Sequence, residues 1–224
     1  GVRGSIDDDV QKSFQGRPHT VAQSELKTDY SSLNRVAYLE NVGVPAISNH
    51  WSLIGGFAGG PEGAALVAIA AQILFLIVHQ AKRGMTNGIW DMRYAGNTSR
   101  MALWSTSISI QAQSAHANSL IGPHGVATAG PCTDMLLYEQ AVLTALNGTS
   151  GICFSSGTAS AGCRLKNYHT GLEDRFGVEI TEVFSLLKRG EANELVKNLL
   201  PKYEEKLSKP PDGKSFPECY DVQE

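Results

Sequence analysis

Residues 55–62 read GGFAGGPE and lead directly into a long run rich in alanine, leucine and isoleucine. Glycine tolerates left-handed backbone and close approach, and proline suits the first turn of a helix, where its missing N–H has no helical partner. The stretch therefore predicts a tight turn from a strand into a helix over residues 61–82. The alternative is a turn that serves packing alone.

Blocks with strand and helix character alternate outward from this turn. Apolar patterning and turn residues predict strands over 42–47, 88–94 and 151–155, and a short extended stretch over 124–128. Capping residues and apolar faces predict helices over 61–82, 99–120 and 133–148, one from Thr170 to near Gly190, and one over 191–207 interrupted at Pro201. We expect the tail from Lys209 to be extended.

Such alternation is typical of a parallel sheet covered by helices. Only about four strand–helix units fit, whereas a complete eight-stranded α/β barrel takes ~250 residues. We therefore predict an α/β fold, either half a barrel or a small open sheet. The predicted organisation is a partial α/β barrel over 1–165, followed by C-terminal helices and an extended tail over 166–224.

Composition excludes several classes of function. The chain has 224 residues, is 42% hydrophobic and 18% charged, and carries a formal net charge of -3. No basic cluster suggests a nucleic-acid partner, and the longest apolar run is about 15 residues, short of a membrane span. The chain starts at Gly1 without a methionine or a signal peptide, so we expect a trimmed start and a cytoplasmic protein.

The four cysteines, at positions 132, 153, 163 and 219, show no C-x-x-C spacing. We expect reduced and mostly buried thiols and no metal site. Cys132 follows Gly130-Pro131 before a predicted helix, and a cysteine nucleophile there is the alternative, although no histidine lies at a suggestive spacing.

Several motifs together carry a resemblance to a known family. Besides the glycine-rich turn they are ELK at 25–27, MRY at 92–94 with Asn97 and Arg100, AGPCTDM at 129–135, SGTASA at 156–161, TGLE at 170–173 and the closing segment 214–222. Over nearly its whole length the chain resembles the C-terminal half of the monomethylamine methyltransferase family. The resemblance implies the C-terminal half of a (β/α)8 TIM-type barrel with C-terminal helices.

The family consists of archaeal enzymes of methanogenesis that transfer a methyl group from methylamine to the cobalt of a corrinoid protein. The resemblance thus implies a small methylated amine and a corrinoid protein as partners. The corrinoid, a cobalamin-type cofactor, is carried by the partner, and none is bound directly. In the family a pyrrolysine imine at the barrel mouth adds the amine and orients its methyl group, so catalysis depends mainly on positioning.

The positions tied to pyrrolysine differ in this chain. Its Gly-Val-X-Gly setting matches residues 1–4, which places Arg3 at the pyrrolysine position. A guanidinium is permanently charged and cannot accept an amine. The family's two glutamates correspond to His19 and Asn49, and its glutamine and tyrosine to His124 and Val126. We therefore take His124, Asn49, Arg3 and His19 as candidate catalytic residues.

The residues themselves also point to the carboxyl ends of the strands, where α/β barrels build their sites. Arg93, Asn97, Trp51 and Glu62 are the candidate substrate-binding residues. Arg93 can hold an anion, and Trp51 can hold an alkylammonium group against its ring face. The simpler interpretations are a salt bridge for Arg93, a core position for Trp51, a favourable helix start for Glu62 and a structural hydrogen bond for His124.

Three functions follow from this sequence. The first is a methyltransferase-like protein that moves a methyl group from monomethylamine to a corrinoid protein. The second is a non-catalytic interaction domain that keeps a corrinoid-protein docking surface or an oligomer surface. The third is a pyrrolysine-independent methyltransferase that uses a quaternary amine, whose methyl group is already activated by positive charge. A half barrel leaves strand edges and apolar surface exposed, so we also expect a homo-oligomer.

Overall fold

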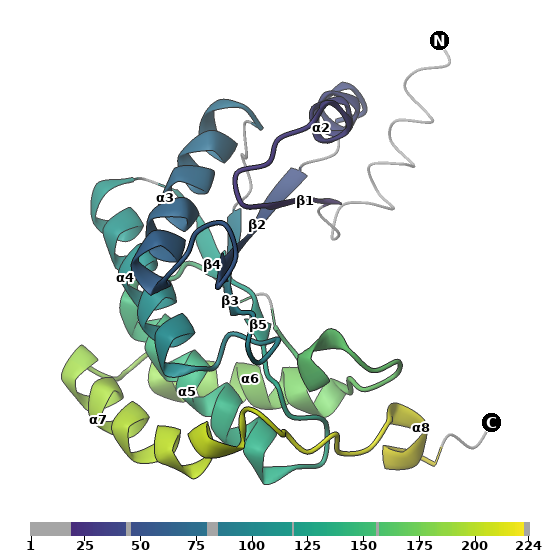
Figure 1. Cartoon of the computed structure of the whole chain (residues 1–224), viewed down its shortest axis with the longest axis vertical. Helices are drawn as coiled ribbons and strands as arrows, with labels where there is room; N and C mark the ends of the chain where they lie inside the picture. Colours follow the sequence, from purple (N-terminus) through teal and green to yellow (C-terminus); the bar gives the residue numbers. More distant parts are fainter. Residues whose placement is uncertain (1–18, 44–45, 80–84, 118, 156, 222–224) are drawn as a thin grey trace.

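The computed structural model describes residues 19–43, 46–79, 85–117, 119–155 and 157–221 (Figure 1). Its main sheet has four parallel strands in chain order: β1 (His19–Ser24), β2 (Ala46–Ile54), β3 (Met85–Asp91) and β4 (Ile121–Pro123). A second parallel pair is formed by β5 (Gly125–Val126) and β6 (Thr158–Ala159). Each of these strand pairings is parallel, so the carboxyl ends of neighbouring strands lie at one edge, which we call the carboxyl rim.

Helices alternate with the strands. α2 (Tyr30–Asn41) follows β1, α3 (Pro61–Ile77) follows β2, α4 (Arg100–His116) follows β3, and α5 (Asp134–Ser150) follows β5. Figure 1 shows α3, α4 and α5 along one side of the strands. The α/β class predicted from the sequence is confirmed.

Side chains cap the helix starts, as the sequence pattern suggests. The hydroxyls of Ser99 and Thr133 accept the backbone N–H groups of Ala102 and Leu136, each at 3.3 Å, and the carboxylate of Asp29 caps α2. At α6 (Gly171–Phe184) the predicted capping box is present, since Glu173 Oε2 accepts the Thr170 N–H at 2.6 Å. Each cap satisfies a donor that the first helical turn leaves without a partner.

The glycine-rich turn joins β2 to α3 as predicted. Gly55 and Gly59 have φ of 88° and 74°, a left-handed region that favours glycine, and the Gly55 N–H donates to the Gly59 carbonyl at 2.8 Å. Pro61 stands at the first position of α3 after the N-cap Gly60. The turn thus reverses the chain at the carboxyl rim and lays α3 back along the sheet.

The C-terminal helices close one side of the molecule. α6, α7 (Arg189–Leu199) and the 3₁₀ turns η2 (Leu200–Lys202) and η3 (Glu204–Lys206) follow one another, and α8 (Phe216–Cys219) lies near the end. A further 3₁₀ turn, η1 (Ala161–Cys163), follows β6. Tyr203 is fully buried and donates through its hydroxyl to the Thr98 carbonyl at 2.8 Å. One apolar cluster joins α4, α5 and the segment after α7, formed by Leu103, Ala127, Ala129, Met135, Leu136, Val142, Leu143, Leu200, Tyr203 and Leu207.

One strand prediction is shifted along the chain and another is wrong, each for a local reason; residues 44–45 of the first lie outside the described residues. Residues 42–47 straddle an element boundary, because Val42 caps the end of α2 and Gly43 turns the chain at φ 72° before β2 begins at Ala46. Residues 151–155 form no strand, because Gly151 ends α5 in a left-handed conformation at φ 102°. The predicted extended tail contains the short helix α8, and the kink at Pro201 appears as the 3₁₀ turn η2.

The cysteine environment also differs from the prediction. Cys132, Cys153 and Cys163 are exposed and Cys219 is partly buried, whereas mostly buried thiols were expected. All four are free cysteines in this structure. Throughout the described ranges, no helix is long and apolar enough to cross a membrane.

Candidate functional site

The two faces of β2 have different roles. His50, Ser52 and Ile54 are buried, and the His50 ring lies 6.2 Å from the ring of Phe75 in α3. Successive side chains of a strand point to opposite faces, so Asn49 and Trp51 lie on the face turned away from α3. Two candidate site residues therefore share the face of the sheet that α3 does not cover.

Three aromatic side chains meet on this face, and we call them the aromatic cluster: Trp51, Trp90 and His124. The Trp51 ring lies 5.0 Å from the ring of Trp90 and 5.1 Å from that of His124, edge to face in both cases. Such geometry between aromatic rings is favourable beyond simple burial. The structure brings together Trp51, which lies within β2, and His124, which lies between β4 and β5, and adds Trp90, which sequence reasoning did not select.

A glycine opposite Trp51 makes room for its ring. Gly88 on β3 is the register partner of Trp51, and a Cβ built there would lie 2.1 Å from a Trp51 ring atom. No side chain fits at that distance without displacing the indole. The position of Trp51 thus depends on the absence of a side chain at residue 88.

Two buried polar atoms on the same face have no hydrogen-bond partner among the described residues. They are Oδ1 of Asn49 and Nε1 of Trp90. Buried polar groups in native proteins are nearly always satisfied by protein, water or ligand, so such atoms mark places where a polar ligand or water fits. One atom accepts a hydrogen bond and the other donates one.

His124 lies between β4 and β5 and is partly buried. Burial, with a smaller contribution from the nearby His169, lowers the pKa of His124 below its ordinary value. The shift favours the neutral imidazole, in which one ring nitrogen can accept a hydrogen bond from a bound N–H group.

Asn97 holds the His124 backbone in place. Its side-chain amide donates to the His124 carbonyl at 2.6 Å, and its Oδ1 accepts the Val126 N–H at 2.8 Å. Asn97 is almost fully buried. These contacts support a positioning role for Asn97 toward His124, in place of direct contact with a substrate.

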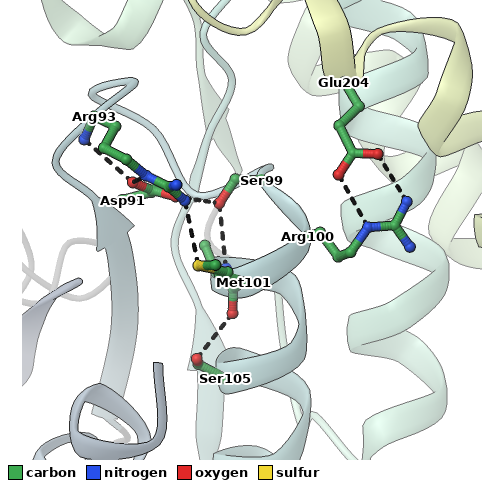
Figure 2. A network of polar contacts seen from close by, with 8 residues as sticks. Asp91, Arg93, Ser99, Arg100, Met101, Ser105 and Glu204 are labelled. Carbon is green, nitrogen blue, oxygen red and sulfur yellow. Dashed lines mark hydrogen bonds and ion pairs between the residues drawn. The ribbon is translucent and has the colours of Figure 1, made fainter. Parts of the chain in front are cut away.

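Arg93 pairs with a buried carboxylate at the end of β3 (Figure 2). Its Nε and Nη2 donate to Oδ1 and Oδ2 of Asp91 at 2.9 and 2.6 Å, and Ser99 donates to Oδ2 at 2.7 Å. Burial opposes ionisation of Asp91, but the hydrogen bonds from Arg93 and Ser99 hold the pKa of Asp91 below its ordinary value. Arg93 thus makes the salt bridge considered as its simpler interpretation.

Sequence reasoning missed Asp91 and Glu139, both completely buried. Glu139 on α5 accepts hydrogen bonds from Thr98 Oγ1, from the Thr128 hydroxyl and N–H, and from the Ala129 N–H. Burial nevertheless raises the pKa of Glu139. An acid directly at a strand end, two residues before an arginine, was the available signal for Asp91. Glu139 has none, because it lies within an ordinary amphipathic helix.

The remaining candidate site residues are Glu62, His19 and Arg3. Glu62 lies exposed in the first turn of α3, at the carboxyl rim. His19 is the first residue of β1, at the end of that strand opposite the rim. Arg3 lies outside the described residues. No group of three or more His, Cys, Asp or Glu side chains converges as a metal site among the residues described.

Comparison with known proteins shows the family to which the chain belongs. A family model described as monomethylamine methyltransferase MtmB matches residues 2–224. The chain belongs to the MtmB family. It is 30% identical over 224 residues to monomethylamine methyltransferase MtmB of Methanosarcina mazei, and 28% identical over 224 residues to MtmB1 of Methanosarcina acetivorans.

These matches cover 99% of this chain but 49% of each relative, so the MtmB-family chain spans about half the length of the curated relatives it matches. The crystal structure of the Methanosarcina barkeri monomethylamine methyltransferase MtmB superposes with a TM-score of 0.85 at 28% identity. That superposition covers 92% of this chain and 45% of the other. A crystal structure described as the hydroxylamine MtmB complex gives the same values.

Proposed function

We propose that this chain is the C-terminal half of a TIM-type methyltransferase that transfers a methyl group from monomethylamine to the cobalt of a corrinoid protein. The observation that carries the proposal is the family match over residues 2–224, supported by the TM-score of 0.85. The sheet order β1-β2-β3-β4, parallel throughout, supports half of a barrel. We keep the boundary near residue 165 and a cytoplasmic location as parts of this proposal.

The aromatic cluster and Asn49 suit a small ammonium ion. Indole faces attract cations by ~0.5–2 kcal/mol, and Asn49 Oδ1 is a buried acceptor for an ammonium N–H. In the proposed reaction the C–N bond breaks with its electron pair on nitrogen, and the methyl carbon bonds to cobalt. A cobalt(I) corrinoid on the partner protein supplies the nucleophilic electron pair.

His124 is placed to orient the ammonium ion. When the C–N bond of a methylammonium ion breaks with its electron pair on nitrogen, ammonia leaves as a neutral molecule and no proton has to be removed. A neutral imidazole can accept a hydrogen bond from the ammonium N–H and so orient the ion. The lowered pKa of His124 favours that neutral form. Asn97 and, through Thr128, Glu139 hold the backbone around it.

Arg3 favours a second candidate within the same chemistry. With arginine at the pyrrolysine position, no imine is available to orient a primary amine. A quaternary ammonium donor needs no adduct, because its methyl group is already bound to a positively charged nitrogen. Trp51 and Trp90 are the side chains with which such a cation would associate.

The test is formation of methyl-cobalt(III), followed by absorbance, after the chain is mixed with a cobalt(I) corrinoid protein. Monomethylamine, dimethylamine, trimethylamine and tetramethylammonium are compared. Turnover with monomethylamine supports the main proposal, and turnover with tetramethylammonium alone supports the second. Binding of the corrinoid protein without turnover of any donor would overturn both and leave the non-catalytic docking domain.

Substitutions in the aromatic cluster can be compared with a substitution elsewhere in the fold. We expect Trp51→Leu and His124→Gln to lower turnover by at least about tenfold, since misplacement of a bound substrate can cost on the order of 10²-fold in rate. Trp104→Leu, on the exposed side of α4, is the matched control and should keep wild-type turnover. Equal loss in all three variants would mean that the aromatic cluster is not the site.

A further inference from the structure

Two thiols from distant parts of the chain meet beside the start of α5. Cys132 directly precedes Thr133, the N-cap of α5, and Cys219 is the last residue of α8. Their Sγ atoms lie 3.1 Å apart, although 87 positions separate them in sequence. A disulfide bond has an S–S length of about 2.05 Å, so only a small approach separates this pair from a covalent link.

The backbone around Cys132 fixes this meeting. Cys132 has φ of 63°, a left-handed conformation uncommon for residues other than glycine. The Gly130 N–H donates to the Pro211 carbonyl at 2.9 Å, and the Lys214 N–H donates to the Pro131 carbonyl at 3.0 Å. A Cβ at Gly130 would lie 1.6 Å from the carbonyl oxygen of Asp212. The tail segment 211–214 therefore packs closely against the turn at residues 130–131, and this contact places Cys219 next to Cys132.

The contact lies at the carboxyl rim. Beyond β5 and β6 the ladder continues, because the Ala127 N–H donates to the Ala159 carbonyl and the Ala161 N–H to the Ala129 carbonyl. Gly130 comes next in the chain, and the tail crosses it there. A covalent link between the two cysteines would hold the tail at this end of the strands.

We propose that Cys132 and Cys219 form an oxidative modification site, a reversible disulfide that fastens the C-terminal tail to the start of α5. A small-molecule disulfide is the oxidant. The exposed Cys132, as thiolate, attacks one of its sulfurs and displaces the first small thiolate. Cys219 loses its proton and attacks Cys132 Sγ, displacing the second. The protein thereby gives up two protons and two electrons, and the oxidant leaves as two thiols.

The other cysteines have no comparable partner. Cys153 Sγ faces the Ser119 carbonyl at 3.9 Å, and among the described residues no second pair of sulfurs lies within hydrogen-bonding distance. Burial and the neighbouring Cys132 thiol raise the pKa of Cys219 to about 11. Because exchange proceeds through thiolates, closure of this disulfide should become faster as the pH rises.

The test uses the full reduced chain in buffers of graded reduced and oxidised glutathione, followed by thiol trapping and peptide mapping. We expect free thiols to fall from four to two, with a single cross-link between the Cys132 and Cys219 peptides that dithiothreitol reverses. Cys153→Ser and Cys163→Ser should keep the cross-link, and Cys132→Ser and Cys219→Ser should lose it.

Trypsin provides a second measurement on the wild-type chain, independent of how the variants fold. Cleavage after Lys214, the last lysine before Cys219, should release the C-terminal peptide from the reduced chain but not from the oxidised one. Four free thiols in the most oxidising buffer, or a cross-link that involves Cys153 or Cys163, would overturn the proposal.

Discussion

At the scale of single residues, Asp91 and Glu204 form a natural comparison (Figure 2). Each carboxylate accepts two hydrogen bonds from one guanidinium group, that of Arg93 for Asp91 and that of Arg100 for Glu204. Asp91 is fully buried, whereas the Glu204 side chain is 33% exposed and its arginine 63% exposed. The same contact geometry therefore occurs in two very different surroundings.

We predict unequal costs for removing the two charges. Asp91→Asn leaves Arg93 and Ser99 with a poorer acceptor in a buried place, and should lower the free energy of unfolding by about 2–4 kcal/mol. Glu204→Gln, the matched control, should cost less than about 1 kcal/mol, because exposed ion pairs contribute little. Urea unfolding of both variants checks this. Equal losses would contradict the role assigned to burial.

His50 predicts how stability depends on pH. Burial lowers its pKa from 6.5 to about 4, so the folded chain keeps this imidazole neutral. Between these values the unfolded chain binds the proton more readily, and stability falls as the pH drops from about 6.5 toward 4. The full difference amounts to about 3 kcal/mol.

The measurement is urea unfolding of the wild type and of His50→Phe at several pH values between 4 and 8. Phenylalanine keeps an aromatic ring beside Phe75 but does not titrate, so the variant should show a shallower loss of stability at low pH. Burial also lowers the pKa values of His79 and His124, so part of the slope should remain. An unchanged slope would show that His50 is not the titrating group.

At the scale of elements, the sequence predicted best where local chemistry decides the structure. Pro61 after four glycines, and Thr170 three residues before Glu173, mark helix starts through contacts made within a few residues. The limits of the strands were less predictable from the sequence. For example, β5 and β6 are two residues each, and they are strands only because they pair with each other over a long separation in sequence. Trp90 and Glu139 were missed for the same reason: both act through contacts between elements that are distant in sequence.

The close contact between β2 and β3 at Gly88 leads to a prediction about stability. Gly88→Ala places a methyl group where the Trp51 ring lies, and should cost about 1–3 kcal/mol in stability through overpacking. The displaced indole should also change the tryptophan fluorescence. Gly148→Ala, inside α5 with open space around the new methyl group, should instead raise stability by roughly 0.5–1 kcal/mol. If both variants behave alike, the close contact at residue 88 is not limiting.

At the scale of the whole molecule, the outer faces of α3 and α4 are unusually apolar. Leu66, Ile73 and Ile77 on α3 and Trp104 and Ile108 on α4 are all exposed, and the two helices pack side by side. Charged side chains normally cover such a surface on a monomeric protein. This surface, together with β1, which pairs only with β2 among the described strands, is the structural reason to expect self-association.

We therefore predict that the chain forms a homo-oligomer through the apolar surface of α3 and α4. In sedimentation velocity the wild type should sediment faster than a 24.0 kDa monomer, and more so at higher concentration. Ile73→Lys and Trp104→Lys each place a charge in that surface and should shift the population toward monomer. Leu186→Lys, at a side chain that is 85% exposed between α6 and α7, should not shift the population.

A folded wild type that stays monomeric at every concentration would show that this surface does not drive assembly. Equal shifts in all three variants would mean that added positive charge, and not the apolar contact, governs it.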